Sequence, residues 1–151
     1  MSYKYFTFSL SITVISWMVG MIVNSFLRKT HFYRDHLSNF NFIRNEQLNL
    51  LIGLPVCKWV VKNTFFGFFN QKITIKKRID RAGLIKLREE MTIAEIDHLI
   101  GFAFVAAFAV FNFYHGRLAL GFTIMAMNIL LNLYPSLLQQ ANKRRLGKII
   151  N

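Results

Sequence analysis

Two uncharged stretches near the C-terminus decide the fold class: Leu99–Tyr114 (LIGFAFVAAFAVFNFY) and Leu118–Leu138 (LALGFTIMAMNILLNLYPSLL), separated only by His115-Gly116-Arg117. As a helix the second covers about 31 Å, which matches a hydrocarbon core of roughly 30 Å. The first has 16 residues and needs an earlier helix start to span. Gly116 suits the end of the first helix, because the residue after a helix often adopts a left-handed backbone conformation that glycine takes easily. We therefore predict a transmembrane helical hairpin over 98–114 and 118–138.

A third uncharged stretch, Tyr5–Leu27, lies near the N-terminus. Its 23 residues are enough for a helix that crosses a membrane. A cleaved signal peptide usually has a basic start, a shorter apolar run and small residues at its cleavage site. Here only Lys4 precedes the run, and the run ends in Asn24-Ser25-Phe26-Leu27. The sequence therefore favours a retained transmembrane helix over 5–27.

Small residues and one proline shape the predicted hairpin. Membrane helices associate by close packing, which small side chains permit. The residues expected to allow it are Gly101, Ala103, Ala106, Ala107 and Ala109. Pro135 lies near the end of the last helix and is expected to kink or terminate it.

Composition and charge agree with a membrane protein. Of 151 residues, 54% are hydrophobic and 17% charged, against roughly 45–50% and 25% in soluble domains. The formal net charge is +12, and 17 of the 19 Lys and Arg residues lie in 28–97 or 139–151. The positive-inside rule predicts that both segments are cytoplasmic, with the N-terminus and 115–117 outside. The lone Cys57 excludes a disulfide-built secreted domain.

The middle of the chain is not a plain linker. Leu48–Phe69 is apolar but carries Pro55, Lys58 and Lys62, which a lipid-exposed spanning helix tolerates badly. An amphipathic helix in the membrane interface fits this pattern better than a fourth span. The basic run at 73–78 is interpreted as a solvated or lipid-facing cytosolic stretch.

These observations predict an all-α integral membrane protein with a single domain over 1–151. It consists of one N-terminal transmembrane helix, a basic cytoplasmic or interfacial segment over 28–97, a C-terminal transmembrane hairpin, and a basic tail over 139–151.

Glu95 and His98 stand out because ionisable groups beside a membrane span are costly. They are three residues apart, so they share one face of a helix. A carboxylate placed there can orient an imidazole and stabilise its protonated form, as a general base requires. Thr92 and Glu95 also fit a capping box, which predicts a helix start at Thr92.

The last helix carries a second polar set. Asn128 and Asn132 are four residues apart and are expected to face inward, either linking helices or forming a cleft for a hydroxyl-bearing head group. Gln139 and Asn142 follow, and beyond them the basic run Lys143-Arg144-Arg145 at the membrane interface could bind lipid phosphate, a thioester carrier, or nothing specific. We expect no metal site, because the single Glu-x-x-His motif lacks the partner ligands of a di-iron bundle.

The order of these residues resembles the glycosyl-4,4'-diaponeurosporenoate acyltransferases, small bacterial membrane proteins of carotenoid biosynthesis. The resemblance covers about 91–147. The motifs that carry it are Ala94-Glu95-Ile96-Asp97-His98-Leu99, Asn132-Leu133-Tyr134-Pro135 and Gln139-Gln140-Ala141-Asn142-Lys143-Arg144-Arg145-Leu146. The chain departs from the family pattern at Gln140, Ala141 and Lys143.

The resemblance implies transfer of a fatty acyl group to a hydroxyl of a lipid-linked sugar. The implied donor is acyl-coenzyme A or acyl carrier protein, with no bound cofactor. His98 would act as the base and Glu95 would orient it. The substrate-binding residues would be Asn128, Asn132, Gln139, Asn142 and Arg145. The expected location is the bacterial cytoplasmic (inner) membrane, and the expected partners are membrane lipid and the lipid-linked substrate.

A non-catalytic small membrane subunit that binds a partner membrane protein is the alternative. In that case the amides and the Glu-x-x-His motif would be links between helices and helix caps. Replacing His98 with alanine separates the two hypotheses, because only a base is needed for turnover. The basic middle segment by itself would suit nucleic acid, but no recognition motif accompanies it, and we expect no nucleic-acid partner.

Overall fold

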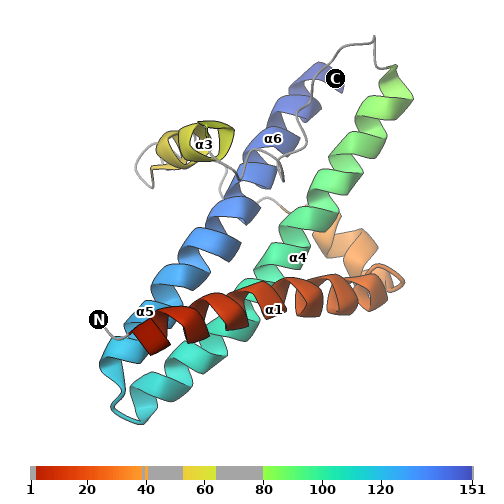
Figure 1. The fold of residues 1–151 in the computed structure, drawn as a ribbon. Helices are drawn as coiled ribbons and strands as arrows, with labels where there is room; N and C mark the ends of the chain where they lie inside the picture. The colour runs from red at the N-terminus through yellow and green to blue at the C-terminus, as the bar shows by residue number, and fades with distance from the viewer. Residues whose placement is uncertain (1–2, 39, 41–52, 64–79, 151) are drawn as a thin grey trace.

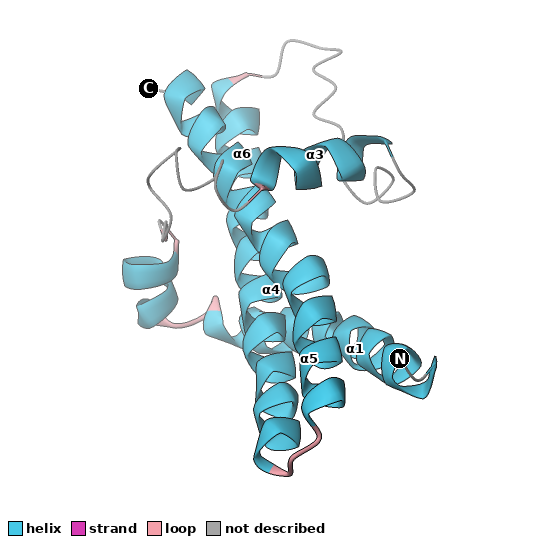
Figure 2. Cartoon of the chain, turned by 90° about the vertical axis from the view of Figure 1, so that its left-hand side faces the viewer, coloured by secondary structure: helices cyan, strands magenta, loops and turns pink. Residues whose placement is uncertain are grey.

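The computed structural model describes residues 3–38, 40, 53–63 and 80–150. All regular structure in this part of the chain is helical (Figure 1 and Figure 2). The elements are α1 (Tyr3–Leu27), the π-helical turn η1 (Tyr33–Leu37), α3 (Leu54–Asn63), α4 (Arg81–Tyr114), α5 (Leu118–Asn128), the π-helical turn η3 (Ile129–Leu133) and α6 (Tyr134–Ile150).

Within the described residues, three helices are long and apolar enough to cross a membrane: Tyr3–Leu27, Arg81–Tyr114 and Leu118–Ile150. The all-helical fold and this number of candidate spans confirm the prediction. The third begins with α5 and runs through η3 and α6, so the predicted tail over 139–151 is helical as far as Ile150. Figure 1 shows α4 and the α5–α6 helix side by side as a hairpin, with α1 crossing it obliquely.

The start of α4 differs from both sequence-based expectations. The helix begins at Arg81, well before the predicted 98, because Asp80 is its N-cap: Asp80 Oδ1 accepts from the Gly83 amide at 2.9 Å. The predicted capping box is wrong, since Thr92 lies inside the helix and its hydroxyl donates to the Arg88 carbonyl at 3.0 Å. The longer helix supplies the length that 16 apolar residues lack.

The turn between α4 and α5 is a Schellman motif. Gly116 has φ of +71°, and its amide donates to Phe113 O at 3.0 Å. The Arg117 amide donates to Asn112 O at 2.9 Å. These two bonds satisfy carbonyls that the end of α4 leaves free. The predicted role of glycine at 116 is confirmed.

Pro135 does not end the last helix, contrary to one of the two predicted outcomes. It follows the π-helical turn η3 and is the second residue of α6. Proline has no N–H, so it cannot donate to Leu131 O, its α-helical acceptor. Trp17 Nε1 of α1 donates to that oxygen at 3.2 Å. The helix therefore continues because a neighbouring helix supplies a donor.

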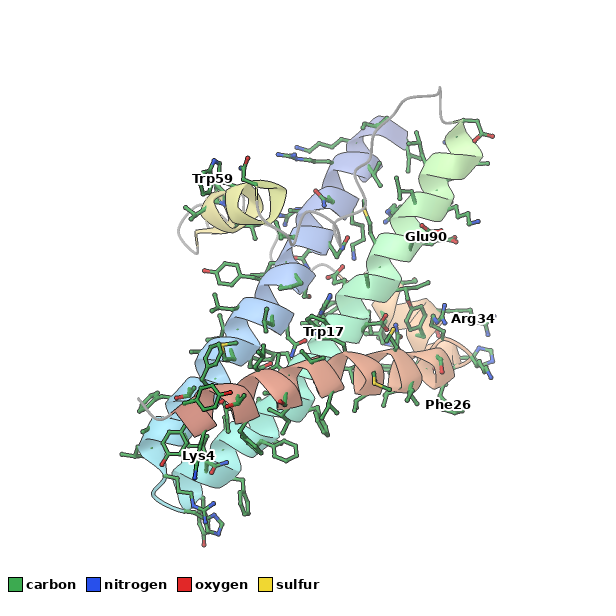
Figure 3. The ribbon with its side chains drawn as sticks, viewed as in Figure 1. Lys4, Trp17, Phe26, Arg34, Trp59 and Glu90 are labelled. Carbon is green, nitrogen blue, oxygen red and sulfur yellow. The ribbon has the colours of Figure 1, made fainter. Side chains whose placement is uncertain are left out.

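Helix α1 buries its small and polar residues and exposes its large apolar ones. The buried residues are Ser9, Ile12, Thr13, Ser16, Gly20 and Asn24. The outward-facing side chains include Phe8, Ile15, Met18, Ile22 and Phe26, the last labelled in Figure 3. This inside-out pattern suits a helix surrounded by lipid, where polar groups face other helices.

Glycines bring the crossing helices into close contact. A Cβ on Gly20 would clash with the backbone of Asp97, so α1 and α4 touch there through the main chain. Among the small residues predicted to permit close approach, Gly101 and Ala109 are buried, Ala106 is half-buried, and two are exposed on α4, namely Ala103 and Ala107. The prediction therefore holds for part of the set.

Helix α3 lies across α6 (Figure 2). Its ten residues extend only about 15 Å, half the thickness of a hydrocarbon core. Val56 and Trp59 are exposed, and Trp59 is labelled in Figure 3. The side chains of Lys58 and Lys62, the ends of the predicted 48–69 helix and the basic run at 73–78 lie outside the described residues. An interfacial position for α3 stays a prediction.

Candidate functional site

A seam of buried polar side chains follows the inner surface where α1, α4 and the η3–α6 helix meet. Its members, each at most 3% exposed, are Ser16, Asn24, Glu95, Asn128, Asn132, Ser136, Gln140 and Lys143. Polar groups at membrane depth are expensive and usually face one another or a functional cavity. We therefore take this seam as the candidate site.

Glu95 pairs with α6 rather than with His98. Its Oε1 accepts from Gln140 Nε2 at 2.9 Å, and its Oε2 forms an ion pair with Lys143 Nζ at 2.5 Å. Lys143 Nζ also donates to the carbonyl of Phe40. The expected arrangement, in which Glu95 orients His98, is therefore not what the structure shows.

The inward position predicted for Asn128 and Asn132 is confirmed. Asn132 Nδ2 donates to Ser16 Oγ of α1 at 3.0 Å and to Asn128 Oδ1 at 2.9 Å. Asn128 Nδ2 donates to Phe102 O of α4 at 3.0 Å. The two amides thus link all three spanning helices, and both N–H groups of Asn132 have acceptors.

His98 lies at this crossing with a nitrogen to spare. Its ring stands edge-on to Trp17, with the centroids 6.3 Å apart, and it lies within hydrogen-bonding reach of the Asn132 side chain. Among the described residues, His98 Nδ1, Asn132 Oδ1 and Ser136 Oγ are buried without a hydrogen-bond partner. Such atoms in a native structure call for an explanation, and a ligand or water that completes them is the usual one.

Local structure explains how Asn132 is placed at this crossing. The π-helical turn η3 contains Asn132, and turns of this kind occur frequently at functional sites. Gly101 lies one turn after His98, and a Cβ there would come within 3.1 Å of both Asn132 Oδ1 and Ser16 Oγ. The glycine therefore leaves the space that the polar groups occupy. Figure 3 labels Trp17 at the same crossing.

A second polar link joins α1 and α4 beside the seam. Asn24 Nδ2 donates to Asp97 Oδ1 at 2.7 Å and to Ile93 O at 3.1 Å. This contact fixes the end of α1 that lies nearer to Glu95, and it gives Asp97 a structural role.

The structure does not bring the remaining predicted residues into the seam. Gln139 and Asn142 are half-buried on α6, and Arg145 is exposed. Their neighbours Gln140 and Lys143 are the residues that face inward. Sequence reasoning did not expect either to face inward, and it placed Lys143 in the interfacial basic run, although the spacing of both from Ser136 is helical. No group of three or more His, Cys, Asp or Glu side chains lies together in the part of the chain that is described.

Arg144 belongs to the basic run that the sequence placed at the membrane interface. It is half-buried, and its Nη1 is buried without a hydrogen-bond partner among the described residues. It interacts electrostatically with Glu95. A guanidinium group that can bind an anion therefore lies beside the seam, at its Lys143 end.

A comparison with protein families agrees with the resemblance found in the sequence. The family model described as glycosyl-4,4'-diaponeurosporenoate acyltransferase matches residues 28–151. This range includes α4, η3 and α6, and it excludes α1. No curated protein and no solved structure matches the chain.

Proposed function

The chain belongs to the glycosyl-4,4'-diaponeurosporenoate acyltransferase family, and we propose that it transfers a fatty acyl group from a thioester donor to a sugar hydroxyl of a glycosylated carotenoid or a similar lipid-linked glycoside. The observation that carries this proposal at the level of residues is the buried His98 Nδ1 without a partner, next to Asn132, with the unpartnered Ser136 hydroxyl one helical turn after Asn132. Together they offer a base and hydrogen-bonding partners for one hydroxyl group.

In the proposed reaction His98 accepts the proton of the sugar hydroxyl while the hydroxyl oxygen attacks the thioester carbonyl carbon. The new C–O bond forms, and collapse of the tetrahedral intermediate breaks the C–S bond. His98 then returns its proton to the leaving thiolate, so the products are an ester and a free thiol. The Ser136 hydroxyl is proposed to donate to the developing oxyanion, because both N–H groups of Asn132 are already engaged.

Glu95 acts in this proposal as a positioning residue. Its pairing with Gln140 and Lys143 holds α6 against α4, and that contact sets where Ser136 lies relative to His98. The acyl donor, acyl-coenzyme A or acyl carrier protein, carries phosphate groups that Arg144 and the exposed Arg145 suit. Gln139 and Asn142, on the outer faces of α6, are proposed to contact the donor or the head group as they enter.

The proposed location is the bacterial cytoplasmic membrane, with the C-terminus in the cytoplasm. The charge distribution supports this orientation, because the basic segments flank the end of the bundle that holds Glu95 and Lys143. Thioester donors are cytosolic, so the proposed orientation and the proposed chemistry require the same face.

The test uses the purified full-length protein in lipid, long-chain acyl-coenzyme A and a glycosylated carotenoid extract, with mass spectrometry of the products. We expect acylated product from the wild type and from His115→Ala, because His115 is an exposed histidine at the hairpin turn. His98→Ala should abolish the product while keeping the helical circular dichroism of the wild type. Product that persists in His98→Ala would refute the assigned base.

The non-catalytic subunit remains the second candidate, and the hydrogen bonds of Asn128 and Asn132 to other helices are the observation that favours it. It predicts no acylated product with any donor and a co-purifying membrane protein whose binding survives His98→Ala.

A further inference from the structure

An open hollow lies far along the bundle from His98, near the turn of the hairpin. Its volume is about 530 Å³, within the roughly 300–1,000 Å³ range of small-molecule sites, and it is open on one side. Its apolar lining comes from α1, α4 and α5, and consists of Phe8, Ala107, Phe108, Phe111 and Leu120. A hollow between membrane-spanning helices with such a lining suits a hydrocarbon chain.

Two polar groups share this lining, Asn112 and Arg117. Asn112 is only 5% exposed, and its Nδ2 donates to Phe108 O at 2.8 Å. Its Oδ1 accepts no hydrogen bond from a described residue, so this lining residue has an acceptor to offer a ligand. The Arg117 amide bonds to Asn112 O at 2.9 Å, which keeps the two residues side by side.

Arg117 is exposed and forms no ion pair within the described residues. The charge distribution explains this, because all seven acidic residues of the chain lie between Asp35 and Asp97. The hairpin turn therefore has a guanidinium group with no carboxylate near it in the sequence. Lys4, one turn before Phe8 on α1, adds a second cation to the same end (Figure 3).

We propose that this hollow binds one anionic phospholipid with a hydroxylated head group. One acyl chain lies against the Phe and Leu side chains, and the phosphate pairs with Arg117. A head-group hydroxyl donates to Asn112 Oδ1. Charge complementarity selects this occupant over a zwitterionic lipid, because a choline head group offers no hydroxyl and adds a cation beside Arg117. The proposal does not depend on the acyl transfer proposed above.

The test measures lipid binding to the purified full-length protein in detergent by native mass spectrometry. The probes are phosphatidylglycerol and phosphatidylcholine with identical chains. We expect phosphatidylglycerol to bind more tightly, and Arg117→Gln to weaken it by about fivefold, the effect of one cation at a membrane surface. Lys86→Gln, which removes an exposed cation of α4 at the other end, should leave the tight site unchanged.

A second pair of variants tests where the acyl chain of the lipid binds. Ala107 lines the hollow and Ala103 lies one turn before it on the same exposed face of α4. Ala107→Trp should fill the hollow and weaken both lipids, whereas Ala103→Trp should weaken neither. Equal binding of the two lipids, an unchanged affinity in Arg117→Gln, or equal effects of the two tryptophans would overturn the proposal. Because these side chains are exposed, the variants should fold, which circular dichroism checks.

Discussion

The buried ion pair between Glu95 and Lys143 gives the sharpest test of how the seam is held together. Both side chains are almost fully buried, at 0% and 4% exposed. Removing one partner leaves the other charge without compensation, which costs about 3–5 kcal/mol. Lys143→Met leaves the Glu95 carboxylate with Gln140 as its hydrogen-bond donor and with the electrostatic interaction of Arg144 in place of the direct ion pair. Glu95→Gln leaves the Lys143 ammonium with neutral acceptors. We expect each single variant to lower the free energy of unfolding by that amount, or roughly two to three and a half powers of ten in the equilibrium constant.

The double variant Glu95→Gln/Lys143→Met should cost much less than the sum of the two. It removes both charges together, and the new amide oxygen still accepts from Gln140. The double-mutant cycle should therefore return an interaction free energy of about 3 kcal/mol or more, at the upper end of values for residues in contact. The assay is reversible unfolding in mixed micelles, followed by circular dichroism.

Lys148→Met is the matched control for this cycle, since Lys148 is an exposed cation on the same helix. Its cost should stay within about 1 kcal/mol. Single variants at Glu95 and Lys143 that are no worse than this control would refute the reasoning. So would a double variant whose cost equals the sum of the single ones, because the two side chains would then not interact.

Three further variants test the packing of α1. Gly20→Ala should lower the free energy of unfolding by about 1–3 kcal/mol, because the added Cβ meets the backbone of α4. Gly147→Ala on α6 is the control: its Cβ meets open space, so it should raise the free energy of unfolding by about 0.5–1 kcal/mol. Unfolding midpoints compare the two. Trp17→Phe should cost about 1 kcal/mol, and less in a Pro135→Ala background, where a backbone amide is restored to the same carbonyl. Asn24→Leu should cost about 1–3 kcal/mol and loosen α1, measured as faster amide exchange.

The spanning helices were predictable because each rests on a long uncharged run, and a membrane requires such runs. The turn was predictable for an equally local reason, since Gly116 lies where a helix must reverse. The start of α4 was missed because the capping-box pattern was applied to Thr92, which lies close to the start of the uncharged run. A helix can begin in water, and Asp80 provides the cap there. The lesson is that a membrane span and the helix containing it have different boundaries.

The candidate site was predicted in composition but not in its pairing. Glu95 and His98 do share a face of α4, yet tertiary contacts decide which group each one meets. The inward face of α6 could have been found from the four-residue spacing of Asn128, Asn132, Ser136 and Gln140. That spacing selects Gln140, whereas the sequence interpretation chose its neighbour Gln139. The family motifs indicate which residue types matter. Helical periodicity was the better guide to which side chains point inward.

Helix α1 is essential to the site even though the family match begins after it, at residue 28. Ser16 accepts one N–H of Asn132, and Trp17 donates to the carbonyl that Pro135 leaves free. Without these two contacts, η3 would hold an unpaired amide and an unpaired carbonyl at membrane depth, where each costs several kcal/mol. Irregular backbone is tolerated in a membrane only where protein or a cavity surrounds it. The π-helical turn that presents Asn132 to His98 can therefore exist only because α1 crosses the hairpin at that level.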